Sequence, residues 1–126
     1  LKHLPKARAI ATDLSPDALN LARENADRHK VSDRIEFLPG DLLTPLAQHP
    51  VAGAKASLHY LVSNPPYIPD HEWDAVEPNV KDHEPHLALR GGSDGLRLVR
   101  PLLESAARFL RPRGLLLIEI AACTAD

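Results

Sequence analysis

The sequence has little cysteine, no excess of charge of one sign and no long hydrophobic run. Its one cysteine, Cys123, excludes an internal disulfide bond and any metal site built from several cysteines. No apolar stretch is long enough to span a bilayer, and the start Leu1–Pro5 is not typical of a signal peptide. These absences predict a cytoplasmic setting under reducing conditions and no membrane partner.

Charge is nearly balanced, with 15 Lys and Arg against 17 Asp and Glu and a formal net charge of −2 at pH 7. The basic residues are scattered rather than gathered in a stripe, so we expect no DNA partner. The seven histidines show no metal-ligand spacing with cysteine, which predicts no metal site. A length of 126 residues predicts one domain, residues 1–126, with a core of its own.

What the sequence does contain is proline, 12 in all, and the most informative pair lies in Asn64-Pro65-Pro66-Tyr67. The motif follows the apolar run 58–63, which is typical of a buried strand. Proline has no backbone N–H for a ladder and its ring fixes φ, so the strand must end at Asn64. A rigid corner then presents the Asn64 amide, backbone carbonyls and the Tyr67 ring at the strand's carboxyl edge, where open α/β sheets bind ligands.

This corner suits methylation of a planar nitrogen. An amide or exocyclic amine is a poor nucleophile because its lone pair is delocalised. The Asn64 side-chain oxygen and the Pro65 carbonyl can accept its two N–H hydrogens, orient the nitrogen and favour the positive charge that grows during attack. The Tyr67 ring can stack on the flat group. A plain proline turn capped by an asparagine is the alternative interpretation.

Strands and helices alternate along the chain. A Ser15-Pro16 start with apolar residues at helical spacing predicts the first helix. Pro101 means that a later helix either kinks or begins its regular part near Arg100. Continuous apolar strands between helices predict an α/β fold with a mostly parallel sheet. The predicted strands cover residues 7–12, 35–38, 58–63 and 115–120, and the predicted helices run from Ser15 to about His29 and from Ser93 or Asp94 to Leu110.

Two connections separate these elements. Residues 44–57 are predicted to contain one helical turn, and residues 68–95 are predicted to be a long polar loop of the kind that is usually functional or mobile. The part from Glu84 to Gly95 can fold back over the site as a lid, in which Glu84 contacts substrate. A glycine-rich loop before a helix is the alternative.

Two aspartates follow predicted strands. Asp13 ends the first strand just before a helix, where a carboxylate can accept both hydroxyls of a ribose. Asp41 follows the second strand and Gly40, and it can accept from an adenine amino group. A helix cap for Asp13 and a tight turn for Asp41 are the alternatives.

Together these residues resemble the HemK/PrmC-type N5-glutamine methyltransferases that modify peptide chain release factors. The Asn-Pro-Pro-Tyr motif alone is shared by several amino-methyltransferases, but the series that follows it at this spacing is specific. The resemblance covers nearly the whole chain and rests on Ala11-Thr12-Asp13-Leu14-Ser15, Gly40-Asp41-Leu42-Leu43, Val62-Ser63-Asn64-Pro65-Pro66-Tyr67-Ile68-Pro69, Glu84-Pro85, Gly91-Gly92, Asp94-Gly95-Leu96 and Leu110-Arg111-Pro112.

The resemblance implies a Rossmann-like, seven-stranded methyltransferase fold that uses S-adenosylmethionine. It implies that Asp13 binds the cofactor ribose, that Asp41 lies by the adenine and that Asn64 borders the cofactor. The reaction it implies is a direct in-line displacement by an amide nitrogen without a dedicated strong base. The glutamine of a Gly-Gly-Gln motif in the release factor would be held by Asn64, Pro65, Pro66 and Tyr67.

The sequence also departs from the family. The family's first strand and glycine-rich loop, which hold the methionine part of the cofactor, are expected before Leu1, and two further strands are expected after the last one here. We therefore expect a partial catalytic domain, truncated at both ends, that binds S-adenosylmethionine poorly by itself. Its unpaired strand edges favour self-association.

Two other functions stay open from the sequence. A nucleic-acid amino-methyltransferase acting on adenine N6 or guanine N2 would use the same corner on a flipped base. An inactive, truncated methyltransferase domain is the non-enzyme alternative. The acidic balance of the chain and the series from Glu84 to Gly95 favour glutamine over a base.

Overall fold

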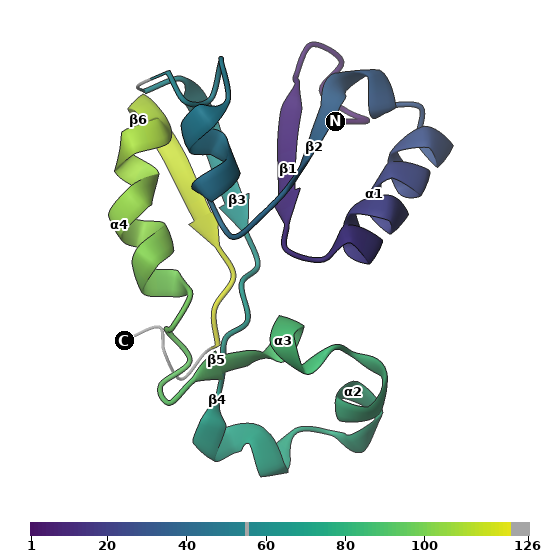
Figure 1. Ribbon diagram of the computed structural model, residues 1–126, viewed down its shortest axis with the longest axis vertical. Coiled ribbons are helices and arrows are strands. Elements are labelled where there is room, and N and C mark those ends of the chain that lie inside the picture. Colours follow the sequence, from purple (N-terminus) through teal and green to yellow (C-terminus); the bar gives the residue numbers. More distant parts are fainter. Residues whose placement is uncertain (55, 122–126) are drawn as a thin grey trace. The chain divides into compact units, whose positions relative to one another are not determined.

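The computed structural model describes residues 1–54 and 56–121, and Cys123 lies outside them. The chain divides into two compact units, the first from Leu1 to Gly53 and the second from Ala54 onward. Figure 1 shows the elements of each unit. The strands of the described residues form three two-stranded pairs, and all three pairs are parallel. The prediction of an α/β fold with parallel strands is confirmed.

The first unit is a strand–helix–strand arrangement. Strand β1 (Ala9–Asp13) pairs with β2 (Ile35–Pro39), and helix α1 (Pro16–Arg28) connects them (Figure 1). The 3-10 turn η1 (Ser32–Arg34) precedes β2, and η2 (Thr44–Gln48) follows it. The predicted strands, the first helix and the helical turn within residues 44–57 are confirmed.

Helix α1 begins as the sequence predicts. The Ser15 hydroxyl accepts a hydrogen bond from the Ala18 N–H at 3.2 Å, and Pro16 occupies the first helical position, where no N–H is needed. Its inward stripe buries Leu19 and Ala26, which are 2% and 4% exposed. This apolar stripe attaches the helix to the strand pair.

The second unit contains another strand–helix–strand arrangement. Strand β3 (Leu58–Ser63) pairs with β6 (Leu110–Ile118), and helix α4 (Val99–Phe109) lies along one face of the pair (Figure 1). The interior between helix and strands is apolar and buried. Its residues include Leu61, Val99, Leu102, Ala106 and Phe109.

The other face of the β3–β6 pair is exposed. Tyr60 lies opposite Leu115 and Val62 lies opposite Leu117 in the ladder, so these four side chains share one face. They are between 50% and 74% exposed. We call these four residues the open apolar face.

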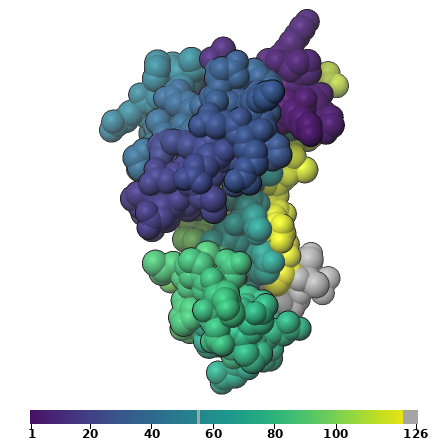
Figure 2. Space-filling view, turned by 90° about the vertical axis from the view of Figure 1, so that its right-hand side faces the viewer, coloured from purple at the N-terminus to yellow at the C-terminus, as the bar shows by residue number. Residues whose placement is uncertain are grey.

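The prediction of a long loop over residues 68–95 is wrong. Strands β4 (Ile68–Pro69) and β5 (Arg90–Gly92) pair in parallel, and short helical elements lie between them. The segment forms one body in the space-filling view (Figure 2). Elements this short in a polar sequence carry no hydrophobic periodicity, so the sequence pattern does not reveal them. The helical elements are η3 (Asp70–Ala75), α2 (Pro78–His83) and α3 (His86–Leu89).

Helix α4 begins at Val99, later than the predicted Ser93 or Asp94. The preceding residues form a turn in which the Asp94 carboxylate accepts the Leu96 N–H at 3.0 Å. Pro101 lies in the first turn of the helix, where its missing N–H needs no partner. The alternative in which the regular helix starts near Arg100 is therefore the correct one.

Strand β6 begins at Leu110, earlier than the predicted residue 115. The ladder pairs Leu58 with Leu110 and next pairs Tyr60 with Leu115, so residues 111–114 form a bulge. The Arg-Pro-Arg-Gly stretch therefore ends the helix as predicted but lies within the strand. None of the helices in residues 1–54 and 56–121 is long and apolar enough to cross a bilayer.

Candidate functional site

Strand β3 runs directly into the Asn64–Tyr67 corner. The Glu119 N–H donates to the Ser63 carbonyl at 3.0 Å, which extends the contact with the β6 chain up to the residue before Asn64. The Pro65 ring is buried and Pro66 is half-buried. Because two prolines fix φ and one of them is packed, the corner holds Asn64 stiffly at the carboxyl end of β3.

Asn64 and Pro65 have hydrogen-bonding groups that no described residue pairs with. Asn64 is exposed, and its side chain makes no hydrogen bond to any residue that the structure describes. In the same residues no backbone N–H donates to the Pro65 carbonyl. Asn64 lines a cleft of about 550 Å³, which is formed by residues 62–64 and 116–119. The corner therefore has two acceptors without a partner in the described residues, and one of them, on Asn64, lies at a cleft.

Tyr67 is held by a residue that sequence reasoning missed. Its hydroxyl donates to the Glu119 carboxylate at 3.1 Å, across 52 positions of the chain. Glu119 also lines the cleft beside Asn64. The available signal was weak: Glu119 is the one charged residue in the apolar stretch 115–120. In the structure, Glu119 is the hydrogen-bond partner of Tyr67, a predicted site residue.

The contact with Glu119 changes the acidity of the phenol. The hydrogen bond to the Glu119 carboxylate raises the pKa of Tyr67, and partial burial and the negative charge of Glu119 act in the same direction. Tyr67 therefore stays protonated at neutral pH and keeps its donor. The ring is therefore fixed at its hydroxyl end.

The glycine-rich turn lies against the backbone of Tyr67. A Cβ on Gly95 would come 2.5 Å from the Tyr67 carbonyl oxygen, and the Gly95 φ is +77°, so both space and conformation require glycine. This part of the predicted lid therefore contacts the corner. Glu84 is exposed at the C-terminal end of α2 and is not among the residues that line the cleft at Asn64.

In the first unit, Asp13 and Asp41 lie at the same edge of the β1–β2 pair. Asp13 ends β1, and the Gly40 N–H, just past β2, donates to the Asp13 carbonyl at 2.9 Å. Gly40 has a φ of +146°, and a Cβ there would lie 2.5 Å from Pro45 Cγ, so the turn that presents Asp41 needs glycine. Both carboxylates are exposed at the carboxyl ends of parallel strands.

The Asp13 carboxylate has a structural contact as well. Its Oδ1 accepts the Ser15 N–H at 2.8 Å, which stabilises the turn into α1. The second oxygen remains an acceptor. The cap alternative and the ligand-binding interpretation of Asp13 are thus compatible, because a carboxylate has two oxygens. Within the described residues, no three His, Cys, Asp or Glu side chains form a group that could hold a metal ion.

Parallel strand–helix–strand units with aspartates and an Asn-Pro-Pro-Tyr corner at the ends of their strands define a Rossmann-like methyltransferase core. No family model matches the chain. Curated relatives do match it, and the chain is 48% identical over 120 residues to the release factor glutamine methyltransferase of Moorella thermoacetica, covering 95% of this chain and 40% of that protein.

Two further relatives carry the same name. The Geobacter sulfurreducens protein is 38% identical over 125 residues, covering 99% of this chain and 41% of the relative. The Deinococcus radiodurans protein is 44% identical over 117 residues, covering 93% of this chain and 38% of the relative. The chain is similar over nearly its whole length to release factor glutamine methyltransferases, as the resemblance predicts, and it spans about 40% of the length of these relatives.

Proposed function

We propose that the protein carrying this chain transfers a methyl group from S-adenosylmethionine to the side-chain amide nitrogen of a glutamine in a peptide chain release factor. The observation that carries the proposal is the Asn64–Tyr67 corner: Asn64 lines a cleft, and among the described residues neither its carboxamide nor the Pro65 carbonyl has a hydrogen-bond partner. The relatives' names specify glutamine in release factors. This favours glutamine over an adenine or guanine amine, and an enzyme over an inactive domain.

In the proposed reaction, the Asn64 Oδ1 and the Pro65 carbonyl accept the two N–H hydrogens of the glutamine NH2 group. They orient the nitrogen and stabilise the positive charge that develops on it, so no strong base is needed before attack. The proton leaves late to water, because an amide nitrogen that has gained a methyl group is strongly acidic. Tyr67, fixed through Glu119, stacks on the flat amide, and Pro66 sets the direction of the corner.

The proposed acceptor is the glutamine of a Gly-Gly-Gln motif. Two glycines beside the glutamine leave the acceptor side chain unshielded, so it can enter a corner bounded by prolines. We assign Glu84, exposed at the end of α2, to contact with the release factor outside the glutamine itself.

The chain's residues fit part of the proposed cofactor. S-adenosylmethionine supplies a methyl group on a sulfonium sulfur when it is bound. The two exposed carboxylates at the end of the β1–β2 pair are acceptors of the kind that ribose hydroxyls and an adenine amino group need. We assign the ribose to Asp13 and the adenine to Asp41, and we place Asn64 beside the cofactor.

The test uses this chain in a protein of the relatives' full length. The matching 120 residues of the Moorella thermoacetica relative are replaced by this chain, and the hybrid is given S-adenosylmethionine labelled in its methyl group and a release factor. We expect label on the glutamine of Gly-Gly-Gln and none when that glutamine is changed to asparagine. A hybrid that binds S-adenosylmethionine but labels no glutamine contradicts the proposal.

In the same hybrid, Asn64→Ala removes one of the two proposed acceptors. We expect turnover to fall about 10²–10³-fold, as for loss of one preorganised hydrogen-bonding group in a transition state, with S-adenosylmethionine affinity unchanged. Asn79→Ala is the matched control, because Asn79 is an exposed asparagine in α2. Equal turnover in Asn64→Ala and Asn79→Ala would contradict the assigned role.

A further inference from the structure

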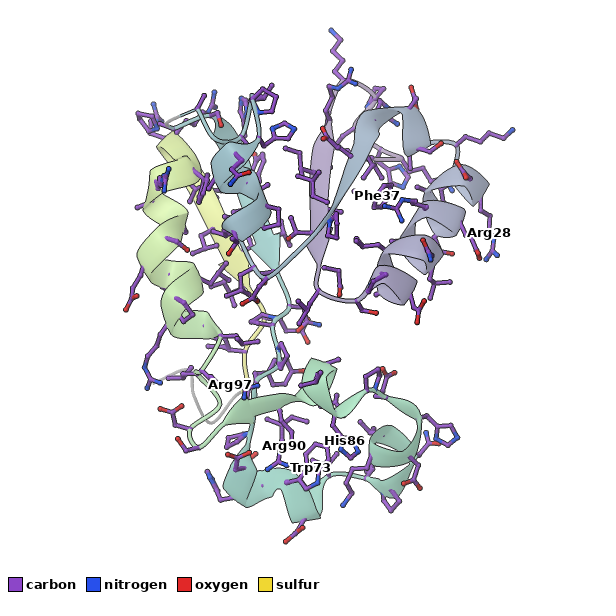
Figure 3. All side chains as sticks on the ribbon, in the orientation of Figure 1. Arg28, Phe37, Trp73, His86, Arg90 and Arg97 are labelled. Carbon is purple, nitrogen blue, oxygen red and sulfur yellow. The ribbon has the colours of Figure 1, made fainter. Side chains whose placement is uncertain are left out.

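A second cleft lies in residues 68–97, and the proposed reaction does not use it. It has a volume of about 380 Å³ and brings together the ends of η3, α3 and β5. Figure 3 shows that Arg90 and His86 point toward Trp73 in the space between these elements. The residues that line it are Asp70, His86, Leu87, Arg90, Gly92 and Arg97.

Arg90 is fixed in place from two sides. Its Nε and Nη2 both donate to Asp70 Oδ1, at 3.1 and 2.7 Å. Its guanidinium carbon lies 5.1 Å from the centroid of the Trp73 ring, a cation–π distance. The Trp73 ring in turn meets His86 edge-on at 4.9 Å. Asp70 binds the Nε–Nη2 edge of the guanidinium, and no hydrogen bond within the described residues uses the Nη1 donors of Arg90.

Arg97 is held by a neutral backbone carbonyl and not by an ion pair with a carboxylate of the described residues. Its Nη2 donates to the Arg90 carbonyl at 3.1 Å, and no carboxylate of the described residues forms an ion pair with it. The absence of a side chain at Gly92 leaves room for it, because a Cβ there would lie 3.1 Å from the Arg97 Cβ. Arg97 therefore keeps Nε and Nη1 donors that no described residue uses, in the same cleft that Arg90 lines.

The lining of this cleft has one positive charge in excess. Asp70 balances Arg90, and Arg97 is left over, with His86 neutral. Two guanidinium groups with free donors suit a planar carboxylate. We propose that this cleft binds the carboxylate of an aspartate or glutamate side chain of a polypeptide.

The position of the cleft favours a polypeptide over a phosphate compound. Strand β4 begins directly after Tyr67, so the cleft lies on the segment that continues from the Asn64–Tyr67 corner. A polypeptide with one residue at the corner can place another in the cleft. A single excess charge matches a carboxylate better than a doubly charged phosphate, and the chain's net charge of −2 does not attract a polyanion. That this polypeptide is the methylation substrate rests on the proposed function.

The single tryptophan of the chain gives a direct test. The chain is titrated, without S-adenosylmethionine, with the capped peptide Gly-Glu-Gly while Trp73 fluorescence is recorded. A matched Gly-Met-Gly peptide and inorganic phosphate are titrated in parallel. We expect a saturable change with the glutamate peptide, none with the methionine peptide, and weaker binding of phosphate.

Arg97→Gln should weaken binding of the glutamate peptide about tenfold or more, because it removes charged donors. Arg111→Gln removes the same charge from an exposed site on β6 that does not line the cleft, and it should bind like the unchanged chain. If Arg97→Gln fails to fold, Arg97→Lys replaces it in the test. This variant keeps the positive charge but lacks the guanidinium donors, so it should bind the glutamate peptide less tightly than the unchanged chain.

Three results would overturn the inference. The first is the same response to both peptides, whether that is equal binding or no change. The second is equal affinity of Arg97→Gln and Arg111→Gln, and the third is tighter binding of phosphate than of the glutamate peptide. Since no methyl transfer is measured, an inactive hybrid in the methylation assay leaves this result standing. A failed titration likewise leaves the proposed methylation standing.

Discussion

At the Asn64–Tyr67 corner, the two prolines and the Tyr67–Glu119 hydrogen bond fix the backbone that carries the Asn64 amide. Pro65 and Pro66 end the β3 ladder and leave the Asn64 amide unpaired within the described residues. Tyr67 turns back to donate to Glu119, which follows the partner strand β6. The corner is therefore attached to the sheet at both ends, and its acceptors need little reordering when a flat amide binds.

The Tyr67–Glu119 contact predicts a measurable acidity. In a Tyr60→Phe background, where Tyr67 is the remaining tyrosine, we expect the phenol to titrate above its ordinary pKa of 10.0. Glu119→Gln should lower this pKa, because it removes the negative charge and the carboxylate acceptor. Phenolate absorbance against pH measures it. Glu104→Gln, on the exposed side of α4, is the control, and the same midpoint in both variants would contradict the contact.

At the scale of elements, the turn before α4 depends on one carboxylate. Asp94 accepts the Leu96 N–H, and it forms an ion pair with Arg100 in the first turn of the helix. The hydrogen bonds from Arg100 and from the Leu96 N–H lower the pKa of Asp94 to about 2, from 3.8. The same contact raises the pKa of Arg100. This pair positions the glycine-rich turn that packs against Tyr67.

Asp94 makes the second unit sensitive to acid in a defined range. Its pKa is lower in the folded chain than in the unfolded chain, so its stabilisation is present above about pH 4 and is lost as pH falls toward about 2. Asp94→Asn should be less stable than the unchanged chain at pH 7, and the difference should vanish near pH 2. Urea unfolding followed by Trp73 fluorescence measures this. Asp82→Asn, exposed in α2, is the control, and a difference that does not change with pH would contradict the prediction.

Helix α4 attaches to the β3–β6 pair through one face. Leu102 is 1% exposed and its neighbour Leu103 is 54% exposed, so the two leucines form a matched pair. Leu102→Ala should lower the free energy of unfolding of the second unit by about 2–5 kcal/mol, because it leaves a cavity. Leu103→Ala should change it by roughly 0.5 kcal/mol or less. Urea unfolding distinguishes them, and similar losses in both variants would show that the helix packs differently.

At the scale of the whole molecule, the open apolar face is the most consequential surface. Apolar side chains from both strands form one patch on it, and a net charge of −2 gives little repulsion between copies. We expect the chain to associate as its concentration rises. Light scattering coupled to size-exclusion chromatography measures the mass.

Charged substitutions on this face should reduce the association. Val62 and Leu117 are opposite each other in the parallel ladder, so Val62→Lys with Leu117→Glu introduces a cross-strand ion pair that keeps the strands together. At concentrations where the measured mass of the unchanged chain rises, the mass of this double variant should stay lower. Leu21→Lys, a single exposed leucine on α1, is the control. Equal masses for all three proteins would contradict a role for the face.

The sequence by itself determined the features that depend on neighbouring residues. Two prolines end a ladder, Ser15 before Pro16 favours a helix start, and a strand that ends in Asp13 presents it at the carboxyl edge, because these effects act over a few bonds. The tertiary structure alone decided which distant residues meet. Tyr67 donates a hydrogen bond to Glu119, 52 positions away in the sequence, and Arg90 donates one to Asp70, 20 positions away. Such contacts follow from strand pairing and from the folding of residues 68–95, whose short polar elements carry no periodicity from which their partners could be predicted.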